Sequence, residues 1–253
     1  MNEFDLIAEI SAEIKARTPV GSGVVLGIDD DAAVLQPARG MQLVATTDNL
    51  VGGRHFVDAG DNRATPEEIG HLALAVNLSD LAAMGATPRW CLLTLTLPEA
   101  DPAWLRAFLD GFLALAAEHD CALVGGNIAR GPLNIGVTAM GEVPAGKFAT
   151  RSGARPGQRI VVTGTVGDAA AGLKLERPVG DPLREILLKP TPRIAAGREL
   201  AGIANSMIDI SDGLLADLAH LTGELGAEIR CDRLPTSSAL AEAVPDPRKR
   251  WRL

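Results

Sequence analysis

Long apolar runs and paired cysteines are both missing from this chain of 253 residues. No apolar stretch reaches the roughly 20 residues that a membrane-spanning helix needs, and no signal peptide precedes the first predicted helix. We therefore expect a cytoplasmic protein with no membrane partner. Cys91, Cys121 and Cys231 are odd in number and far apart. Because this spacing matches neither a zinc site nor a disulfide framework, we expect reduced, mostly buried thiols.

Positive charge is also scarce. The chain has 24 lysines and arginines against 32 acidic residues, a formal net charge of -8. Apart from a short basic run at residues 248–252, the basic side chains are spread along the sequence. The absence of a basic stripe argues against a general nucleic-acid-binding protein. A Gly-x-x-x-x-Gly-Lys-Ser/Thr loop is missing too, which excludes a P-loop NTPase.

What the chain does have is aspartate at several turns and segment ends, in a sequence that is 47% hydrophobic. Asp30 and Asp31 precede one strand-like run, Asp48 follows another, and Asn77 and Asp80 share one face of a predicted helix. Carboxylates that converge repel one another and resist ionisation, so cations must neutralise such a set. Oxygen-only ligands suit Mg²⁺ or Ca²⁺. The sequence therefore predicts a Mg²⁺-dependent protein that handles nucleotide phosphates.

Apolar periodicity predicts an N-terminal domain over residues 1–148, with helices facing a mainly antiparallel sheet. Thr65-Pro66-Glu67-Glu68 is a capping box with proline at the first helical position, so a helix should run from Pro66 to about Met84. Asp101 and Pro102 begin another helix. The other expected elements are a helix over residues 4–14 and strands over residues 43–47, 90–97 and 133–143.

A change of composition near residue 150 marks the expected domain boundary. Residues 151–157 are mostly turn formers, and the apolar run 160–164 begins the first strand of a second α/β domain over residues 149–253. Further along we expect two helices, over residues 168–175 and after Pro192. A strand over residues 207–210 and a helix beginning at Ser211 should follow.

Taken in order, the motifs resemble those of the thiamine-monophosphate kinase family, within the superfamily that contains aminoimidazole ribonucleotide synthetase. Each motif alone is weak evidence, but together they span nearly the whole chain. The matching segments are Asp30-Asp31-Ala32-Ala33-Val34-Leu35, Thr46-Thr47-Asp48, His55-Phe56, Asn77-Leu78-Ser79-Asp80-Leu81-Ala82-Ala83-Met84-Gly85-Ala86, Gly125-Gly126, Arg151-Ser152-Gly153-Ala154 and Asp209-Ile210-Ser211-Asp212-Gly213-Leu214.

The resemblance implies an α/β fold whose N-terminal sheet joins that of a second copy in a barrel-like homodimer. It also implies that ATP binds between the two domains and phosphorylates thiamine monophosphate to thiamine diphosphate. His55 would contact the thiamine phosphate. Gly126, Asn127, Arg151 and Ser211 would contact ATP, and several Mg²⁺ ions would be held by Asp30, Thr46, Thr47, Asp48, Asp80, Asn127, Asp209 and Asp212.

This set of residues suits phosphoryl transfer between two anions. Catalysis of this kind consists mostly of positioning and charge neutralisation. Mg²⁺ ions held by one or two carboxylates each can bridge donor and acceptor. A phosphate nucleophile is already ionised near neutral pH, so we assign no catalytic base. His55 and Arg151 can donate hydrogen bonds to phosphate oxygens.

Several positions depart from the family pattern. Asp29 replaces a glycine, and Gly52-Gly53-Arg54 replaces the Glu-Gly-Val that precedes His-Phe. Asn127 replaces the aspartate of Gly-Gly-Asp-Thr, so one expected ligand is neutral. The chain also has no tyrosine, and the family's Asp-Tyr-Glu-Leu segment is therefore absent. We expect a second domain that is incomplete relative to the family, with an open sheet edge.

Three functions remain open at this point. The motif order favours the kinase of thiamine monophosphate. Gly52, Arg54 and Asn127 favour a related ATP-dependent enzyme with another substrate. The missing segment favours a degenerate homologue that binds nucleotide without turnover, and the scaffold alone cannot decide because it hosts several chemistries.

Overall fold

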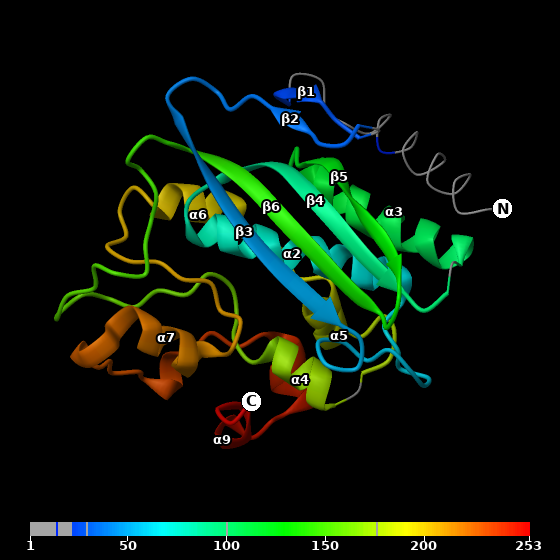
Figure 1. Cartoon of the computed structure of the whole chain (residues 1–253). Helices are drawn as coiled ribbons and strands as arrows, with labels where there is room; N and C mark the ends of the chain where they lie inside the picture. Colours follow the sequence, from blue (N-terminus) through cyan, green and yellow to red (C-terminus); the bar gives the residue numbers. More distant parts are fainter. Residues whose placement is uncertain (1–13, 15–21, 29, 100, 176) are drawn as a thin grey trace.

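A four-stranded mixed sheet with helices on one face forms the centre of the molecule (Figure 1). The computed structural model describes residue 14 and residues 22–28, 30–99, 101–175 and 177–253. The strand order is β3-β6-β4-β5, in which β4 and β5 are parallel and the other two pairs are antiparallel. This confirms the predicted sheet, which faces helices and is mainly antiparallel. The helix expected over residues 4–14 lies outside the described residues except for Ile14.

The elements follow the predicted order in the first half of the chain. The strands are β1 (Val24–Leu26), β2 (Val34–Leu35), β3 (Met41–Val51), β4 (Thr87–Leu97), β5 (Ala122–Arg130) and β6 (Asn134–Pro144). The helices are α2 (Pro66–Ala83), α3 (Pro102–Glu118), α4 (Asp168–Lys174), α5 (Pro182–Leu188), α6 (Ile194–Leu200), α7 (Leu214–Thr222), α8 (Ser238–Ala243) and α9 (Pro247–Arg250), with short 3₁₀ turns at Gly223–Leu225 and Cys231–Arg233.

Helices α2 and α3 begin where their capping residues predict. The Thr65 hydroxyl accepts the backbone N–H of Glu68, and the Glu68 carboxylate accepts that of Thr65, so the capping box is complete. Asp101 caps α3 by accepting the N–H groups of Ala103 and Trp104. Each cap satisfies N–H groups that have no partner inside the helix.

The main core lies between the sheet and these two helices. Cys91, Leu93 and Leu95 alternate along β4 and point to the helix side, where Phe108 and Phe112 are fully buried. The two rings stack with centroids 6.1 Å apart. On the opposite face of the sheet, Trp90 packs under the small β1–β2 hairpin.

Helices α2 and α3 cross at two glycines. A Cβ atom added to Gly70 would overlap the carbonyl oxygen of Phe108, and one added to Gly111 would overlap that of Glu67. Both glycines therefore let the two backbones approach more closely than any side chain permits.

Gly111→Ala is accordingly expected to lower the free energy of unfolding by about 1–3 kcal/mol, because the added methyl group must push α2 and α3 apart. Urea denaturation would measure the change. Ala114→Gly, on the exposed face of the same helix, is the control for helix propensity and should cost about 1 kcal/mol. A Gly111→Ala variant as stable as the original would mean that the crossing is not tight.

Two details of the sheet differ from the prediction. We expected Asp48 to end its strand, but β3 continues to Val51 and Asp48 pairs with Val137 in mid-strand. Sequence reasoning also missed β5, because Gly125-Gly126-Asn127 lowers the local strand propensity. Parallel pairing with β4 provides the backbone hydrogen bonds that hold this segment extended.

The second half of the chain packs as helices and irregular segments against the first. The strands predicted over residues 160–164 and 207–210 are wrong, since neither run has strand structure. Val161 is 75% exposed, and β propensity is realised only where a neighbouring strand supplies hydrogen bonds and packing. The helix over residues 168–175 is confirmed as α4, the one after Pro192 as α6, and α7 begins three residues after Ser211.

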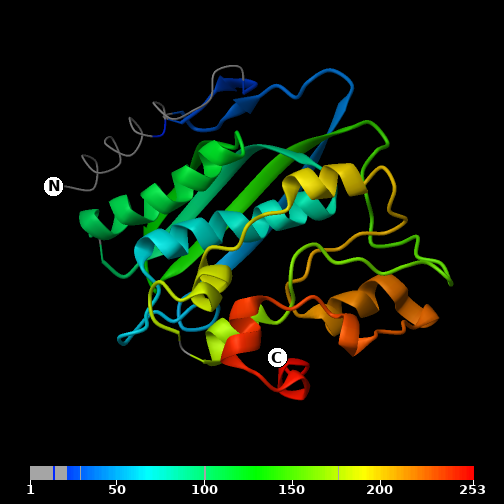
Figure 2. The same ribbon diagram turned by 180° about the vertical axis from the view of Figure 1, so that it is seen from behind.

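Helix α6 is the part of the second half that lies closest to α2 (Figure 2). A Cβ atom added to Gly197 in α6 would overlap the carbonyl oxygen of Ala82 in α2. A Cβ atom added to Gly85, which follows α2 with a φ of 72°, would likewise lie 2.4 Å from the Cβ atom of Ala201. The two halves are therefore in direct backbone contact at the C-terminal end of α2.

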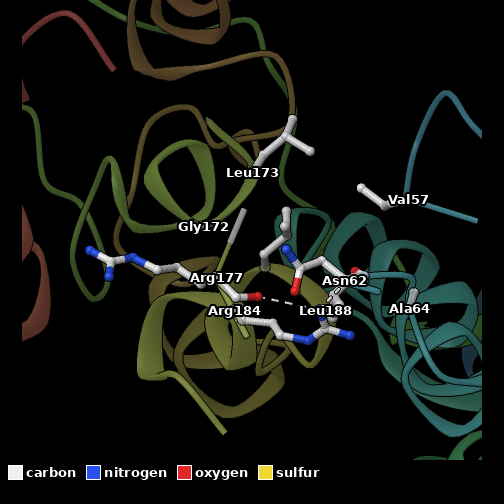
Figure 3. Close-up of a pocket in the computed structure, with 9 residues that line it drawn as sticks. Val57, Asn62, Ala64, Gly172, Leu173, Arg177, Arg184 and Leu188 are labelled. Atoms are coloured by element: carbon white, nitrogen blue, oxygen red, sulfur yellow. Dashed lines mark hydrogen bonds between the residues drawn. The ribbon is translucent and has the colours of Figure 1, made fainter. Parts of the chain in front are cut away.

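Arg184 makes the second connection between the halves. Its guanidinium, in α5, donates to both carboxylate oxygens of Glu68, at 3.0 and 2.8 Å. It also donates to the carbonyl oxygens of Asn62, Arg63 and Arg177. Figure 3 shows this side chain beside Asn62 in the small pocket between the β3–α2 loop and helices α4 and α5. Because Arg184 and Glu68 are each about 3% exposed, the ion pair is buried.

Two further expectations concern the cysteines and the membrane. All three cysteines are free; Cys91 and Cys121 are buried, as predicted, while Cys231 is exposed. Among the described residues, none of the helices is both long enough and apolar enough to cross a bilayer.

Candidate functional site

Three aspartates from distant parts of the sequence share one region beside α2. Asp48 lies on β3, Asp80 in the last turn of α2, and Asp209 in the segment that precedes α7. Two hydroxyl groups connect them to neighbouring elements. Thr46 donates to Asp80 Oδ2 at 2.6 Å, and Ser79 donates to Asp209 Oδ2 at 3.1 Å. We call Asp48, Asp80 and Asp209 the acidic cluster.

The carboxylates of the acidic cluster repel one another. Burial raises the pKa of Asp48, the negative charge of Asp80 raises it further, and His55 offsets part of the effect. Burial and the charge of Asp80 likewise raise the pKa of Asp209, against smaller opposing effects of Ser79 and Arg151. The negative charge of Asp80 therefore acts on both other members of the acidic cluster, as expected where carboxylates converge.

Two basic side chains flank the acidic cluster. His55 lies in the loop after β3, where its Nδ1 atom accepts the backbone N–H of Val51 at 2.9 Å. Electrostatic interaction with His55 lowers the pKa of Asp48, and interaction with Arg151 lowers that of Asp209. The remaining ring nitrogen of His55 and the Arg151 guanidinium can donate to an anion next to the carboxylates.

Other predicted residues lie apart from the acidic cluster in a single copy of the chain. Side chains alternate along β3, so Thr47 points to the sheet face opposite Thr46 and bonds with Thr138. Gly126 and Asn127 lie on β5, at the other edge of the sheet from β3. The two edge strands are three strand spacings apart, about 14 Å. One copy therefore does not bring Asn127 to Asp48.

The remaining predicted residues occupy exposed turns. Asp30 lies before β2, where its Oδ1 atom accepts the N–H of Asp31 at 2.8 Å. Ser211 and Asp212 lie in the loop before α7, and both side chains are exposed. Among the described residues, neither Asp30 nor Asp212 hydrogen-bonds to the acidic cluster. Of the predicted metal ligands, the structure brings together Thr46, Asp48, Asp80 and Asp209.

Sequence reasoning missed two residues here. Ser79 precedes Asp80 in a motif identified from the sequence, and its hydroxyl group could have been predicted to hydrogen-bond near the site. Asp58 had no such signal. A Cβ atom added to Gly52 would lie 2.6 Å from Asp58 Oδ2. A carboxylate thus lies against the position at which the family pattern has glutamate.

The donor set fits a hard divalent cation. Its donors are carboxylate and hydroxyl oxygens. Burial and the charge of Asp80 raise the pKa values of Asp48 and Asp209, so a bound cation would favour the ionised forms of both. Among the residues described, no three His, Cys, Asp or Glu side chains are close enough to enclose an ion by themselves. Mg²⁺ suits such an open arrangement because it commonly keeps water and takes phosphate oxygens as further ligands.

Comparison with known proteins supports the same reading. Residues 29–143 match the family described as AIR synthase related protein, N-terminal domain. The chain is 44% identical to thiamine-monophosphate kinase of Escherichia coli over an alignment 262 positions long, gaps included, which covers 99% of this chain and 78% of that protein.

Two solved structures are similar over most of the chain. The crystal structure of thiamine-monophosphate kinase from Stenotrophomonas maltophilia has a TM-score of 0.87 and 46% identity, with 94% of this chain and 79% of that one covered. AaThiL in complex with AMPPCP and TMP has a TM-score of 0.76 and 34% identity, with 98% and 80% covered. With this identity over nearly its whole length and the family's acidic motifs in order, the chain belongs to the thiamine-monophosphate kinase family.

Proposed function

We propose that this chain transfers the γ-phosphoryl group of ATP to thiamine monophosphate, giving thiamine diphosphate and ADP. The observation that carries the proposal is the acidic cluster, which β3, α2 and the segment before α7 bring together with His55 and Arg151 beside it. The complex of AaThiL with AMPPCP and TMP supports it, because a relative with 34% identity binds both kinds of ligand.

The residues of the site would act by positioning and by charge. Several Mg²⁺ ions, when bound, would neutralise the two phosphate groups and let them approach. The carboxylates of Asp48, Asp80 and Asp209 would hold these ions, with Thr46 orienting Asp80 through its hydroxyl. Arg151 would donate to ATP and His55 to the acceptor phosphate. No group is required as general base, because the acceptor oxygen is already ionised.

The remaining proposed contacts come from residues outside the acidic cluster. We retain Ser211, Gly126 and Asn127 as contacts to ATP. Mg²⁺ ligands outside the cluster would be Asp30, Thr47, Asn127 and Asp212. The proposal also keeps the domain limits 1–148 and 149–253 and a cytoplasmic location.

A homodimer would bring Asn127 of one copy close to Asp48 of the other, although the two residues lie far apart within one copy. Within the part of the chain that the structure describes, β3 and β5 are the edge strands of the sheet, and each pairs with another strand on one side only. The sheet face of Thr47 also carries Leu43, which is 50% exposed. If β5 of a second copy lay beside β3, Asn127 of that copy would approach the region of Asp48, and one barrel would cover both apolar faces.

One observation favours a different acceptor. The Asp58 carboxylate lies against Gly52, and Arg54 adds a positive charge to the same loop. This arrangement differs from the Glu-Gly-Val pattern of the family, so a related phosphate-bearing acceptor is the second candidate.

A coupled assay of the purified chain tests the proposal. Mg-ATP and thiamine monophosphate are supplied, ADP and thiamine diphosphate are followed together, and Mg-AMPPCP binding is measured by calorimetry. Equal amounts of both products would support the kinase. ADP formed only with another phosphorylated acceptor would favour the second candidate, and binding without any turnover would indicate a degenerate homologue.

A further inference from the structure

The loop that precedes α7 is held by one carboxylate. Asp217, in the first turn of α7, is 3% exposed. Its Oδ2 atom accepts the backbone N–H of Ser211 at 2.9 Å, of Asp212 at 3.1 Å and of Gly213 at 3.1 Å. Three successive N–H groups thus converge on a single buried oxygen, and the negative charge of Asp217 also raises the pKa of Asp209 in the acidic cluster.

The arrangement resembles an anion-binding loop whose anion is part of the chain. Successive backbone N–H groups that point into one concavity commonly bind phosphate or carboxylate. Here Asp217 fills the concavity, so these N–H groups are not free to bind ATP. Gly213 has a φ of 115°, a conformation that favours glycine and turns the loop into the helix.

The outward side of the loop carries the polar side chains. Ser211 and Asp212 are both exposed, whereas their N–H groups face Asp217 in the interior. Asp217 therefore holds the backbone of the loop on its inner side, while the side chains of Ser211 and Asp212 lie on its outer surface. Asp209, a member of the acidic cluster, lies two residues before Ser211 on the same segment.

We propose that Asp217 is a positioning residue of the phosphoryl-transfer site: its buried carboxylate fixes the backbone of residues 211–213 so that Ser211 and Asp212 face the nucleotide and its metal. The inference rests on the proposed function, since it assigns Asp217 a role in that site. Asp217 itself touches no reacting atom. Its removal should weaken nucleotide binding more than the chemical step.

Substitutions at Asp217 should form a graded series. Asp217→Asn keeps one oxygen that can accept the N–H groups but loses the charge that strengthens the bonds. Asp217→Ala removes the acceptor entirely and leaves three N–H groups without a partner. We expect the KM for Mg-ATP to rise severalfold in the asparagine variant and at least about tenfold in the alanine variant, with a smaller change in kcat.

Asp168 provides a matched control for general destabilisation. It is 1% exposed, lies in the first turn of α4, and accepts the hydroxyl groups of Thr165 and Ser237. Asp168→Asn therefore also neutralises a buried, hydrogen-bonded carboxylate near a helix start. It should lower the melting temperature without raising the KM for Mg-ATP.

The experiment compares the original chain with the Asp217→Asn, Asp217→Ala and Asp168→Asn variants. Three quantities are measured: amide hydrogen exchange at residues 211–213, calorimetric affinity for Mg-AMPPCP, and the KM and kcat values. The inference is supported if amide exchange becomes faster and Mg-AMPPCP binding becomes weaker from the original chain to Asp217→Asn and again to Asp217→Ala. Asp168→Asn should keep the exchange rates and the affinity of the original chain. Asp217 variants that match Asp168→Asn in nucleotide affinity would overturn it.

The proposed function can fail separately. If the original chain binds Mg-AMPPCP but does not phosphorylate thiamine monophosphate, the kinase assignment is lost, and the affinity series still decides the role of Asp217. If the original chain binds no Mg-AMPPCP, there is no nucleotide site for Asp217 to position, and both proposals are overturned.

Discussion

Arg184→Ala is expected to lower the free energy of unfolding by about 3–5 kcal/mol, because it leaves the Glu68 carboxylate buried without its partner. Glu68 is 3% exposed and accepts two hydrogen bonds from Arg184. The substitution also removes the donors to the carbonyl oxygens of Asn62 and Arg63. Urea denaturation monitored by circular dichroism would measure the loss.

A neighbouring ion pair provides the control. Lys189 donates to Glu67 at 2.7 Å and also connects the end of α5 to α2, but the two side chains are 31% and 55% exposed. Lys189→Ala should therefore cost less than about 1 kcal/mol. Equal effects of Lys189→Ala and Arg184→Ala would contradict the view that burial decides the strength of the contact.

The effect of Arg184→Ala should depend on pH. Burial opposes ionisation of Glu68, but hydrogen bonds from Arg184 and Thr65 outweigh it and hold the pKa of Glu68 below its ordinary value of 4.5. A lowered folded-state pKa adds stability above pH 4.5, which is lost as pH falls through the folded-state pKa. The difference in the free energy of unfolding between Arg184→Ala and the original chain should accordingly narrow as the pH falls through the folded-state pKa of Glu68.

Local signals in the sequence predicted the elements of the first half, but not those that depend on distant partners. The capping box at Thr65 and the proline at position 66 define the start of α2 without reference to the rest of the chain. The glycine-rich β5 is a strand only because β4 pairs with it. Conversely, residues 160–164 have strand-like composition but no strand beside them among the described residues, so they remain irregular.

The same distinction applies to the site. Carboxylates at segment ends predicted that acids would converge, and Asp48, Asp80 and Asp209 do share one electrostatic environment. Their partners could not be predicted, because the bond between Ser79 and Asp209 joins residues 130 positions apart. The burial of Arg184 could not be predicted either, since a single arginine in a short helix is usually exposed.

The acidic cluster produces the second large effect. Asp48→Asn is expected to reduce Mg-ATP turnover by about 10²- to 10³-fold, because the variant keeps an oxygen but loses the charge that holds the cation opposite the phosphates. The fold should stay intact, since asparagine has nearly the same shape. The coupled assay with saturating Mg-ATP would measure the loss.

The same substitution should raise the stability of the folded chain in the absence of Mg²⁺, although it lowers turnover. Burial and the charge of Asp80 raise the pKa of Asp48 above its ordinary value of 3.8. The folded chain therefore loses stability as pH rises from 3.8 through the raised folded-state pKa, and this loss persists at neutral pH. Asp48→Asn removes the ionised group, so its melting temperature without Mg²⁺ should exceed that of the original chain.

Magnesium connects the two effects. The ion binds the folded chain, so it should raise the melting temperature of the original protein by mass action and that of Asp48→Asn by much less. Asp61→Asn neutralises an exposed carboxylate outside the acidic cluster and should respond to Mg²⁺ like the original. If Asp48→Asn kept its turnover and its full response to Mg²⁺, Asp48 would not be a metal ligand. If it lost activity and also melted lower without Mg²⁺, the carboxylate would be stabilising the fold, and repulsion within the acidic cluster would be the wrong account.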